Sequence, residues 1–413
     1  MKFYFPDSQD MISPTYDFQH DEYSPLRVRQ RDDLYAHEVL AEPPYQGLLV
    51  SKSIIDGSIN GAGKYSEAQR GRLYRLGVRR YFRLPDNIET LGDNGAFNYV
   101  QERVPPVTAA ETLDFYEQCA FDAGVSVDHV ILGYNAAAGL DGPNPDWAER
   151  RLLTLRLAEE FITLTTERAS TVNPVGAAQG WSPASYADSV QHLQMMGYQR
   201  IALGGMVPLK TDQILACLRA IEPIRAPTTE LHLLGVTRVD SFDTFADFGV
   251  SSFDSTSAFR QSFMDDRRNY HALGADYIAI RVPQVEGNPV LKRNILAGLV
   301  SQKDAVAAER ICLRQLRAYD AGTASAASVL NALANYEVVT SSKKSYIPAY
   351  ERTLRNAPWK RCDCRICTRD GIEVAIFRGA ERNKRRGFHN LHVLAKRLNQ
   401  RSLVTADERV LCG

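Results

Sequence analysis

Between residues 45 and 285 the sequence alternates short apolar runs with amphipathic stretches. The runs are GLLVSKS (47–53), RRYFRLP (79–85), VDHVILGY (127–134), NPVGAAQG (173–180), RIALGGM (200–206), ELHLLGV (230–236), GVSSFDS (249–255) and DYIAIRV (276–282). Helical periodicity is clearest from Asp146 to Arg168, where apolar residues recur every three or four positions. About eight strands that alternate with helices predict a (β/α)8 TIM barrel, an α/β fold, although a doubly wound open sheet would give a similar pattern.

The barrel segment divides the chain into four predicted regions. Residues 1–45 form an N-terminal extension rich in Asp, Tyr and Pro, to which we assign no function, and residues 46–285 form the barrel. Residues 286–345 are Ala-rich and helical, and they predict an added helical layer. Residues 346–413 form a basic subdomain that carries a cysteine cluster.

The composition is that of a soluble globular protein, with 44% hydrophobic and 24% charged residues and a formal net charge of zero. No apolar run is long enough to span a membrane, and the N-terminus MKFYFPDSQD lacks the apolar stretch of a secretory signal. We therefore expect a cytoplasmic protein without membrane contact. The charge is uneven, because residues 343–401 carry 16 Lys and Arg against five acids. This local excess would attract phosphates.

The strongest single motif is a cysteine cluster near the C-terminus. Cys362, Cys364 and Cys367 form a C-x-C-x-x-C turn, which can supply three of the four ligands of a tetrahedral zinc ion. The nearest later candidates for the fourth are His389 and His392, which lie on the same face of a helix. Four protein ligands would make the zinc structural. The alternative is three unliganded surface thiols, which would be a reactive liability.

Two aspartates and two backbone motifs lie where strands are predicted to end. Asp254 follows the apolar run 249–253, and Asp93 lies in a glycine-flanked turn. A pair of carboxylates suits displacement at an anomeric carbon, because one can attack C1′ while the other transfers protons. An aspartate after a strand is also a common N-cap or turn residue, so the context has to decide. Gln179 can bond a purine edge, and Gly204-Gly205 offers bare backbone to a flat ring.

Taken in chain order, these motifs resemble the tRNA-guanine transglycosylase superfamily. In that family the barrel carries a D-x-G-G-like turn, then Q-G, G-G-hydrophobic, L/M-G-V and F-D, followed by C-x-C-x-x-C and a distant His-Asn. The corresponding motifs here are Asp93 to Ala96, Gln179-Gly180, Gly204 to Met206, Leu234 to Val236, Phe253-Asp254, Cys362 to Cys367 and His389-Asn390.

The resemblance implies a role for each matched residue. Asp254 would be the nucleophile on C1′, and Asp93 would be the general acid and base. The base pocket would consist of Gln179, Gly204, Gly205, Leu234 and Gly235. Structural zinc would be held by Cys362, Cys364, Cys367 and His389, with His389 preferred because the family's ligand is followed by Asn-Leu.

Two departures from the family pattern bear on the substrate. The family has an acid near the end of the strand assigned here to VDHVILGY, where it bonds the incoming base, whereas this chain offers Asn135, with Asp141 a few residues later. Either Asn135 or Asp141 takes the place of that acid in binding the base, or base recognition differs. The run FDSTSAFRQ (253–261) resembles the DNA-modifying branch called DpdA, which inserts 7-cyano-7-deazaguanine (preQ0) into DNA. No PUA-like RNA-binding extension follows the zinc motif.

The expected function is therefore exchange of guanine in DNA for preQ0 by a pentosyltransferase, through a covalent aspartyl-sugar intermediate. The alternatives are the same chemistry on tRNA, or a non-catalytic subunit that binds nucleic acid. Helper proteins or a homodimer would be further partners. Basic residues around the zinc motif are expected to grip phosphates; they are Lys360, Arg361, Arg365, Arg382, Lys384, Arg385 and Arg386.

Overall fold

The computed structural model describes the whole chain except residues 8, 58–62, 343 and 412–413, and it describes side chains up to residue 400. The chain folds into two compact units. The first consists of residues 1–8, 45–256 and 398–413, and the second of residues 9–44 and 257–397.

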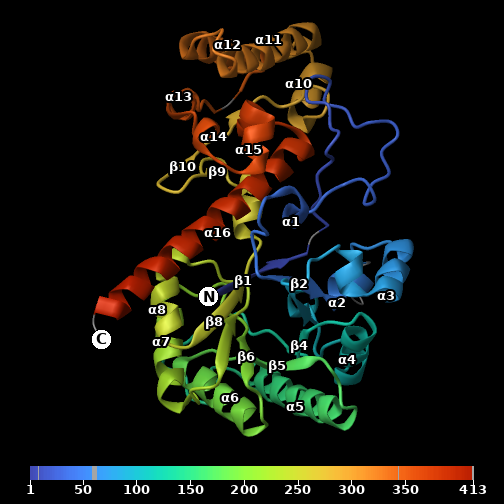
Figure 1. Cartoon of the computed structure of the whole chain (residues 1–413), viewed down its shortest axis with the longest axis vertical. Helices are drawn as coiled ribbons and strands as arrows, with labels where there is room; N and C mark the ends of the chain where they lie inside the picture. Colours follow the sequence, from blue (N-terminus) through green and yellow to red (C-terminus); the bar gives the residue numbers. More distant parts are fainter. Residues whose placement is uncertain (8, 58–62, 343, 412–413) are drawn as a thin grey trace. The chain divides into compact units, whose positions relative to one another are not determined.

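The first unit is a closed barrel of eight parallel strands in sequential order (Figure 1). The predicted TIM-like α/β fold is therefore confirmed. The strands are β1 (Lys2–Pro6), β2 (Gly47–Ser51), β3 (Glu89–Asp93), β4 (Ala123–Val125), β5 (Asn173–Ala178), β6 (Arg200–Leu203), β7 (Glu230–Leu233) and β8 (Val250–Asp254).

Five of the predicted apolar runs contain barrel strands, and three do not. RRYFRLP begins inside helix α3 (Glu67–Tyr81), and VDHVILGY is buried irregular chain that follows the short strand β4. DYIAIRV forms the two-residue strands β10 (Asp276–Tyr277) and β11 (Ile280–Arg281), each of which pairs with a different short strand outside the barrel. Three barrel strands lie outside the predicted runs; they are β1, within the predicted N-terminal extension, β3 and β4.

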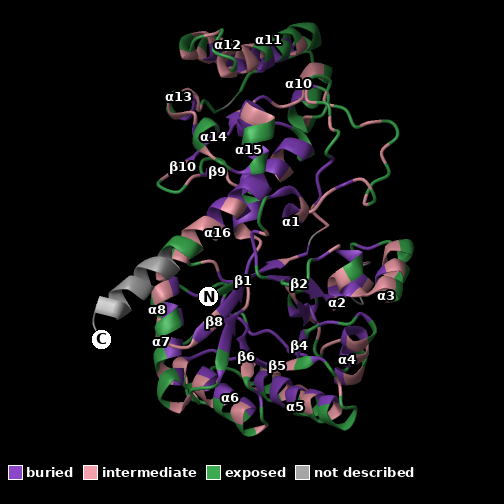
Figure 2. Cartoon of the chain, in the orientation of Figure 1, coloured by how far each residue is buried: buried purple, intermediate pink, exposed green. Residues whose placement is uncertain are grey.

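The barrel helices begin at clear local signals. The predicted long helix is α5 (Pro145–Glu167), which starts with Pro145 and is capped by the Asn144 side chain. The other helices of this unit are α2 (Lys52–Asp56), α3, α4 (Ala109–Gln118), α6 (Pro183–Met195), α7 (Thr211–Ile221) and α8 (Phe242–Asp247). Buried residues follow the barrel strands and the inner faces of these helices (Figure 2).

The N-terminal end of the barrel is closed by a polar network. Glu89 accepts a hydrogen bond of 2.6 Å from the Tyr4 hydroxyl and another of 2.6 Å from Arg200. Arg200 also donates to the Tyr4 oxygen at 3.0 Å. Above this layer, apolar side chains fill the interior; the cluster is Tyr4, Leu49, Leu91, Ala123, Val125, Val175, Ala177 and Ala202. A ligand site is therefore expected at the C-terminal strand ends, where TIM barrels carry their sites.

The second unit is mainly helical. The helices predicted between residues 286 and 345 are present as α10 (Pro289–Leu296), α11 (Gln302–Asp320) and α12 (Ala326–Val339), and α11 packs against α12. The remaining helices are α1 (Ala36–Val39), α9 (Ser257–Met264), α13 (Ile347–Asn356), α14 (Pro358–Arg361), α15 (Arg365–Asp370) and α16 (Gly379–Leu411). Among the described residues, no helix has both the length and the apolar character needed to cross a bilayer.

Candidate active site and metal centre

Asp93 is the last residue of β3 and lies beside Ser51, the last residue of β2. The Ser51 hydroxyl donates a hydrogen bond of 2.5 Å to Asp93 Oδ2. Desolvation raises the pKa of Asp93 to about 7; the Ser51 hydrogen bond lowers it, while the nearby carboxylates of Asp128 and Asp254 raise it. A carboxyl group with this pKa can give and take a proton near neutral pH, which is the property of a general acid and base.

Asp128, which the sequence motifs did not single out, is the third carboxylate of this group. It follows the end of β4 and is 3% exposed. The side-chain amides of Asn94 and Gln179 donate to its two oxygens at 2.9 Å and 2.5 Å. The Tyr99 hydroxyl in turn donates to the Asn94 amide oxygen. Burial raises the pKa of Asp128, whereas the two amide donors lower it.

Gly204 and Gly205 follow β6 and leave their backbone bare beside this carboxylate. A Cβ at Gly204 would lie 2.1 Å from Gln179 Nε2 and 3.4 Å from the nearer Asp128 oxygen. Gly205 has φ +70, and a Cβ there would lie 2.4 Å from the Ile131 carbonyl oxygen. Only glycine fits such positions, because the Gln179 side chain and the Ile131 carbonyl already fill the space that a side chain would need.

Asp254 is the last residue of β8 and is 7% exposed. Its Oδ1 accepts a hydrogen bond of 2.9 Å from the Gly235 backbone N–H and lies 3.1 Å from His232 Nε2. His232 Nδ1 lies 2.9 Å from Ser252 Oγ. Leu234, which follows β7, is partly buried and packs against the barrel core. His232 is a second residue that the sequence motifs missed, because it lies inside a strand.

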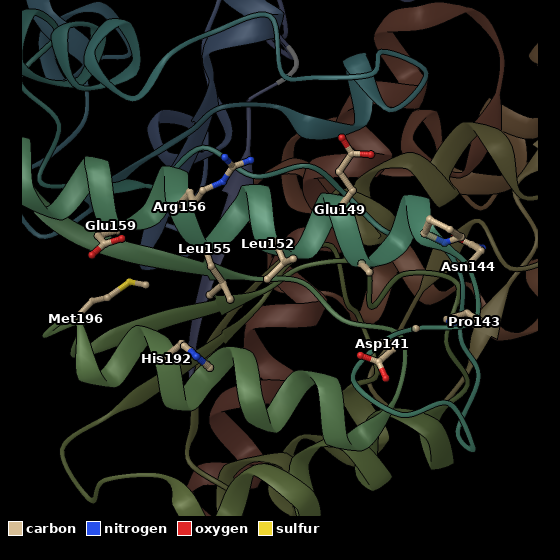
Figure 3. A pocket seen from close by; sticks show the side chains of 13 residues that line it. Asp141, Pro143, Asn144, Glu149, Leu152, Leu155, Arg156, Glu159, His192 and Met196 are labelled. Atoms are coloured by element: carbon tan, nitrogen blue, oxygen red, sulfur yellow. The ribbon is translucent and has the colours of Figure 1, made fainter.

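Asn135 and Asp141, the two substitutes expected for the family's acid, do not join this group. Asn135 is exposed, and its side-chain oxygen accepts a hydrogen bond of 3.2 Å from the Ala137 N–H. Asp141 lines a separate hollow of about 1000 Å³ along α5 and α6 (Figure 3). None of the three grouped carboxylates lines that hollow. The polar side chain found directly beyond β4 is Asp128, while a role for Asn135 in base binding stays a prediction.

The second unit contains a cluster of four metal-ligand side chains. The Nδ1 atom of His389 lies 3.4, 3.5 and 3.3 Å from the sulfurs of Cys362, Cys364 and Cys367. All four ligand atoms lie within 4.8 Å of one another. The cysteines lie at the start of α15, and His389 comes from α16. The remaining His389 nitrogen, Nε2, donates to the His271 carbonyl oxygen at 2.7 Å, which fixes the ring.

The structure distinguishes the two histidines that spacing alone left open. His392 Nε2 lies 3.2 Å from Asp363, an exposed residue that also pairs with Lys396. His392 lies close to Cys362 and Asp363, whereas the buried Cys364 and Cys367 lie close to His389. His389 is therefore the histidine that lies within ligand distance of all three cysteines.

Three of the arginines predicted to bind phosphates are buried and already paired. Arg382 bonds Asp21 and Glu373, and it is 1% exposed. Arg385 is also 1% exposed and pairs with Asp370. Arg386 is fully buried and donates to backbone carbonyl oxygens. These residues stabilise the second unit, so the prediction that they grip phosphates is wrong.

Asp21, an acidic partner of Arg382, shows a structural role for part of the N-terminal segment. Asp21 lies in the stretch 9–44, which belongs to the second unit, and it also pairs with Arg378 at 2.6 Å. The same stretch offers the Ser13 carbonyl oxygen to Arg385. Residues 9–44 thus neutralise buried arginines of the second unit.

The chain is similar to one curated protein over its entire length. A protein from Salmonella montevideo named DNA-guanine transglycosylase is 46% identical over 415 residues, and the alignment covers 99% of each chain. No protein-family model matches the chain.

Proposed function

Because the chain belongs to the guanine transglycosylases, glycosyltransferase enzymes that act on nucleic acid, we propose that it exchanges guanine in DNA for 7-cyano-7-deazaguanine. The choice of DNA rests on the name of the full-length relative and on the FDSTSAFRQ run, which resembles the DpdA branch. The observation that carries the chemistry is the group of three carboxylates at the C-terminal strand ends.

In the proposed reaction, the target guanine first leaves the base stack, at a cost of a few kcal/mol, so that C1′ becomes reachable. Asp254 then attacks C1′, and Asp93 gives its proton to the departing guanine. The pKa of about 7 for Asp93 supports this role, because a useful fraction of the group is protonated at neutral pH. The incoming deazaguanine next attacks C1′ and returns a proton to Asp93. Two displacements restore the original configuration.

Base recognition in this proposal depends on Asp128 and its amide partners. Guanine and preQ0 both present N–H donors on the pyrimidine edge, and an ionised carboxylate accepts two of them. Asn94 and Gln179 hold the Asp128 oxygens in place. Gly204 and Gly205 let Gln179 pack closely against the end of β6, which keeps its amide beside Asp128. The fixed carboxylate selects a base that offers two donors.

The direct test follows label release from two nucleic acids. Purified protein is incubated with DNA or with tRNA carrying radiolabelled guanine, in the presence of 7-cyano-7-deazaguanine. We expect label to be released from DNA and deazaguanine to enter it in equal amounts. Release from tRNA alone would overturn the DNA assignment, and release from neither would overturn the proposed exchange.

We further propose that the cysteine cluster holds a structural zinc ion. Zinc bonds of about 2.3 Å to sulfur and about 2.0 Å to nitrogen place tetrahedral ligands roughly 3.5 Å apart. The distances of 3.3–3.5 Å from His389 to the three sulfurs fit this geometry. All four positions are filled by protein, so the ion would join the start of α15 to α16 and take no part in chemistry.

Removal of the metal is expected to destabilise the second unit strongly. Structural zinc sites contribute roughly 10 kcal/mol or more of binding free energy, which is lost with the ion. His389→Ala should abolish stoichiometric zinc and lower the melting temperature, whereas His392→Ala should retain both. Metal content by atomic emission and thermal unfolding by circular dichroism measure the two effects. Zinc loss in His392→Ala alone would reverse the ligand assignment.

The exposed basic residues of the same region remain available for DNA. Arg361 and Arg365 are exposed and have no ion-pair partner among the described residues. Lys360 is exposed as well, although its ammonium contacts the Asp320 carbonyl oxygen at 2.7 Å. We propose that these three residues contact phosphates, which adds affinity with little sequence preference.

A further inference from the structure

A line of three polar side chains leads from the barrel interior to the proposed nucleophile. Ser252 and Asp254 are two residues apart on β8, so their side chains point to the same side of the strand. His232 lies across from Ser252 on β7. His232 and Ser252 are each 2% exposed, and the Tyr4 ring packs edge-on against the imidazole with ring centres 5.5 Å apart.

The direction of each hydrogen bond follows from the groups involved. A carboxylate can only accept, so His232 carries a hydrogen on Nε2 toward Asp254. The other ring nitrogen, Nδ1, has the Ser252 hydroxyl as its hydrogen-bond partner. The Gly235 N–H donates to the same Asp254 oxygen, Oδ1. Both donors therefore hold Oδ1, and Oδ2 receives no hydrogen bond from the described residues.

We propose that His232 is a positioning residue that holds Asp254 Oδ1, so that Oδ2 attacks C1′, and that it stabilises the Asp254 carboxylate when the ester bond to C1′ breaks. This inference rests on the proposed double displacement. In the first step the Oδ2–C1′ bond forms, the bond from C1′ to guanine breaks, and its electron pair and the Asp93 proton go to guanine. In the second step the deazaguanine nitrogen bonds C1′, its proton returns to Asp93, and the Oδ2–C1′ electron pair returns to Asp254.

The two steps depend differently on the donors at Oδ1. The negative charge of Asp254 is present before the first step and after the second, and it is absent in the ester between them. A hydrogen bond to Oδ1 stabilises the charged carboxylate, so it favours release of the ester. Loss of the His232 donor should therefore slow the second step more than the first. The covalent protein–DNA ester should then accumulate.

The test compares His232→Phe, which keeps a packed ring against Tyr4, with His232→Gln, which keeps an N–H donor. Steady-state exchange on DNA gives kcat and KM, and denaturing gels give the fraction of protein bound covalently to DNA. We expect His232→Phe to lower kcat roughly 10- to 100-fold, the loss typical of one charge-assisted hydrogen bond, and to lower KM for DNA as well, because a slower second step lets the ester build up. The ester fraction should rise, and His232→Gln should recover much of kcat.

Ser252→Ala provides a milder second variant, because it removes only the hydrogen bond between Ser252 and His232 Nδ1. A smaller fall in kcat with the same rise in ester supports the proposal even if His232→Phe folds poorly. A fall in kcat with an unchanged ester fraction and a lower melting temperature would mean a merely structural role and would overturn it. If the native protein forms no ester on DNA or tRNA, the double displacement itself fails, and this inference with it.

Discussion

Asp254→Asn is expected to lower guanine release from DNA by roughly 10⁴-fold or more, the size of effect seen when a covalent nucleophile is removed. The amide cannot form the ester with C1′, so the covalent protein–DNA species should disappear as well. The substitution keeps the shape of the side chain, and its oxygen can still accept from Gly235 and His232. The fold and DNA binding should therefore be preserved. Single-turnover release of radiolabelled guanine and denaturing gels measure the two losses.

A charge-matched control separates this effect from the loss of a negative charge. Asp212 is an exposed residue in the first turn of α7, outside the carboxylate group. Asp212→Asn should leave guanine release within about twofold of the native rate, as surface substitutions usually do. An ester that persists in Asp254→Asn would assign the nucleophile to another carboxylate, with Asp128 and Asp93 the nearest candidates.

Much of the site could be predicted because parallel strands of a barrel end on the same rim. Asp93, Gln179, Gly204 and Asp254 are far apart in sequence, yet each is the last residue of a strand or follows one directly. Once a barrel is predicted, strand ends are expected to converge, and chemistry gathers at that face. The cluster of potential metal ligands was predictable for a different reason, since three cysteines within six residues have few other uses.

Asp128 was missed because the strand before it was placed incorrectly. His232 was missed because functional residues were sought only at the ends of strands. Strand β4 has three residues and ends at Val125, whereas the apolar run suggested a strand through residues 127–134. That shift moved the expected strand end from Asp128 to Asn135. His232 alternates with apolar residues inside β7, a pattern that a core histidine would share. Its role depends on Ser252 and Asp254 across the ladder, and one strand's sequence does not reveal that pairing.

The arginines of α16 show why a charge count is a weak guide to a binding surface. Arg382 and Asp21 are separated by most of the chain, yet they form a buried ion pair. Burial of an arginine requires partners, and here acids and carbonyl oxygens supply them. The local excess of positive charge in the sequence is therefore partly cancelled by the segment 9–44.

Asp93 is expected to give the exchange reaction an alkaline limb near pH 7. Desolvation, strengthened by the charges of Asp128 and Asp254, raises the pKa of Asp93 to about 7. The first displacement needs the protonated form, so single-turnover guanine release should fall about tenfold per pH unit above that value. Asp93→Asn should remove this limb and lower the rate at pH 6 roughly 10²- to 10⁴-fold, the usual contribution of general acid catalysis.

The same pKa predicts that Asp93→Asn, which lowers the rate of exchange, raises the stability of the protein at high pH. This effect tests the pKa of Asp93 without an activity measurement. The pKa of Asp93 rises from an ordinary value of 3.8 to about 7 on folding, so the folded chain holds this proton more tightly than the unfolded chain does. The free energy of unfolding therefore falls as pH rises from about 4 to about 7, and the cost is complete above that range. Asp93→Asn should then melt at a higher temperature than the native protein at pH 8, with little difference at pH 4. Equal melting temperatures at pH 8, together with an unchanged alkaline limb, would assign the general acid to another group.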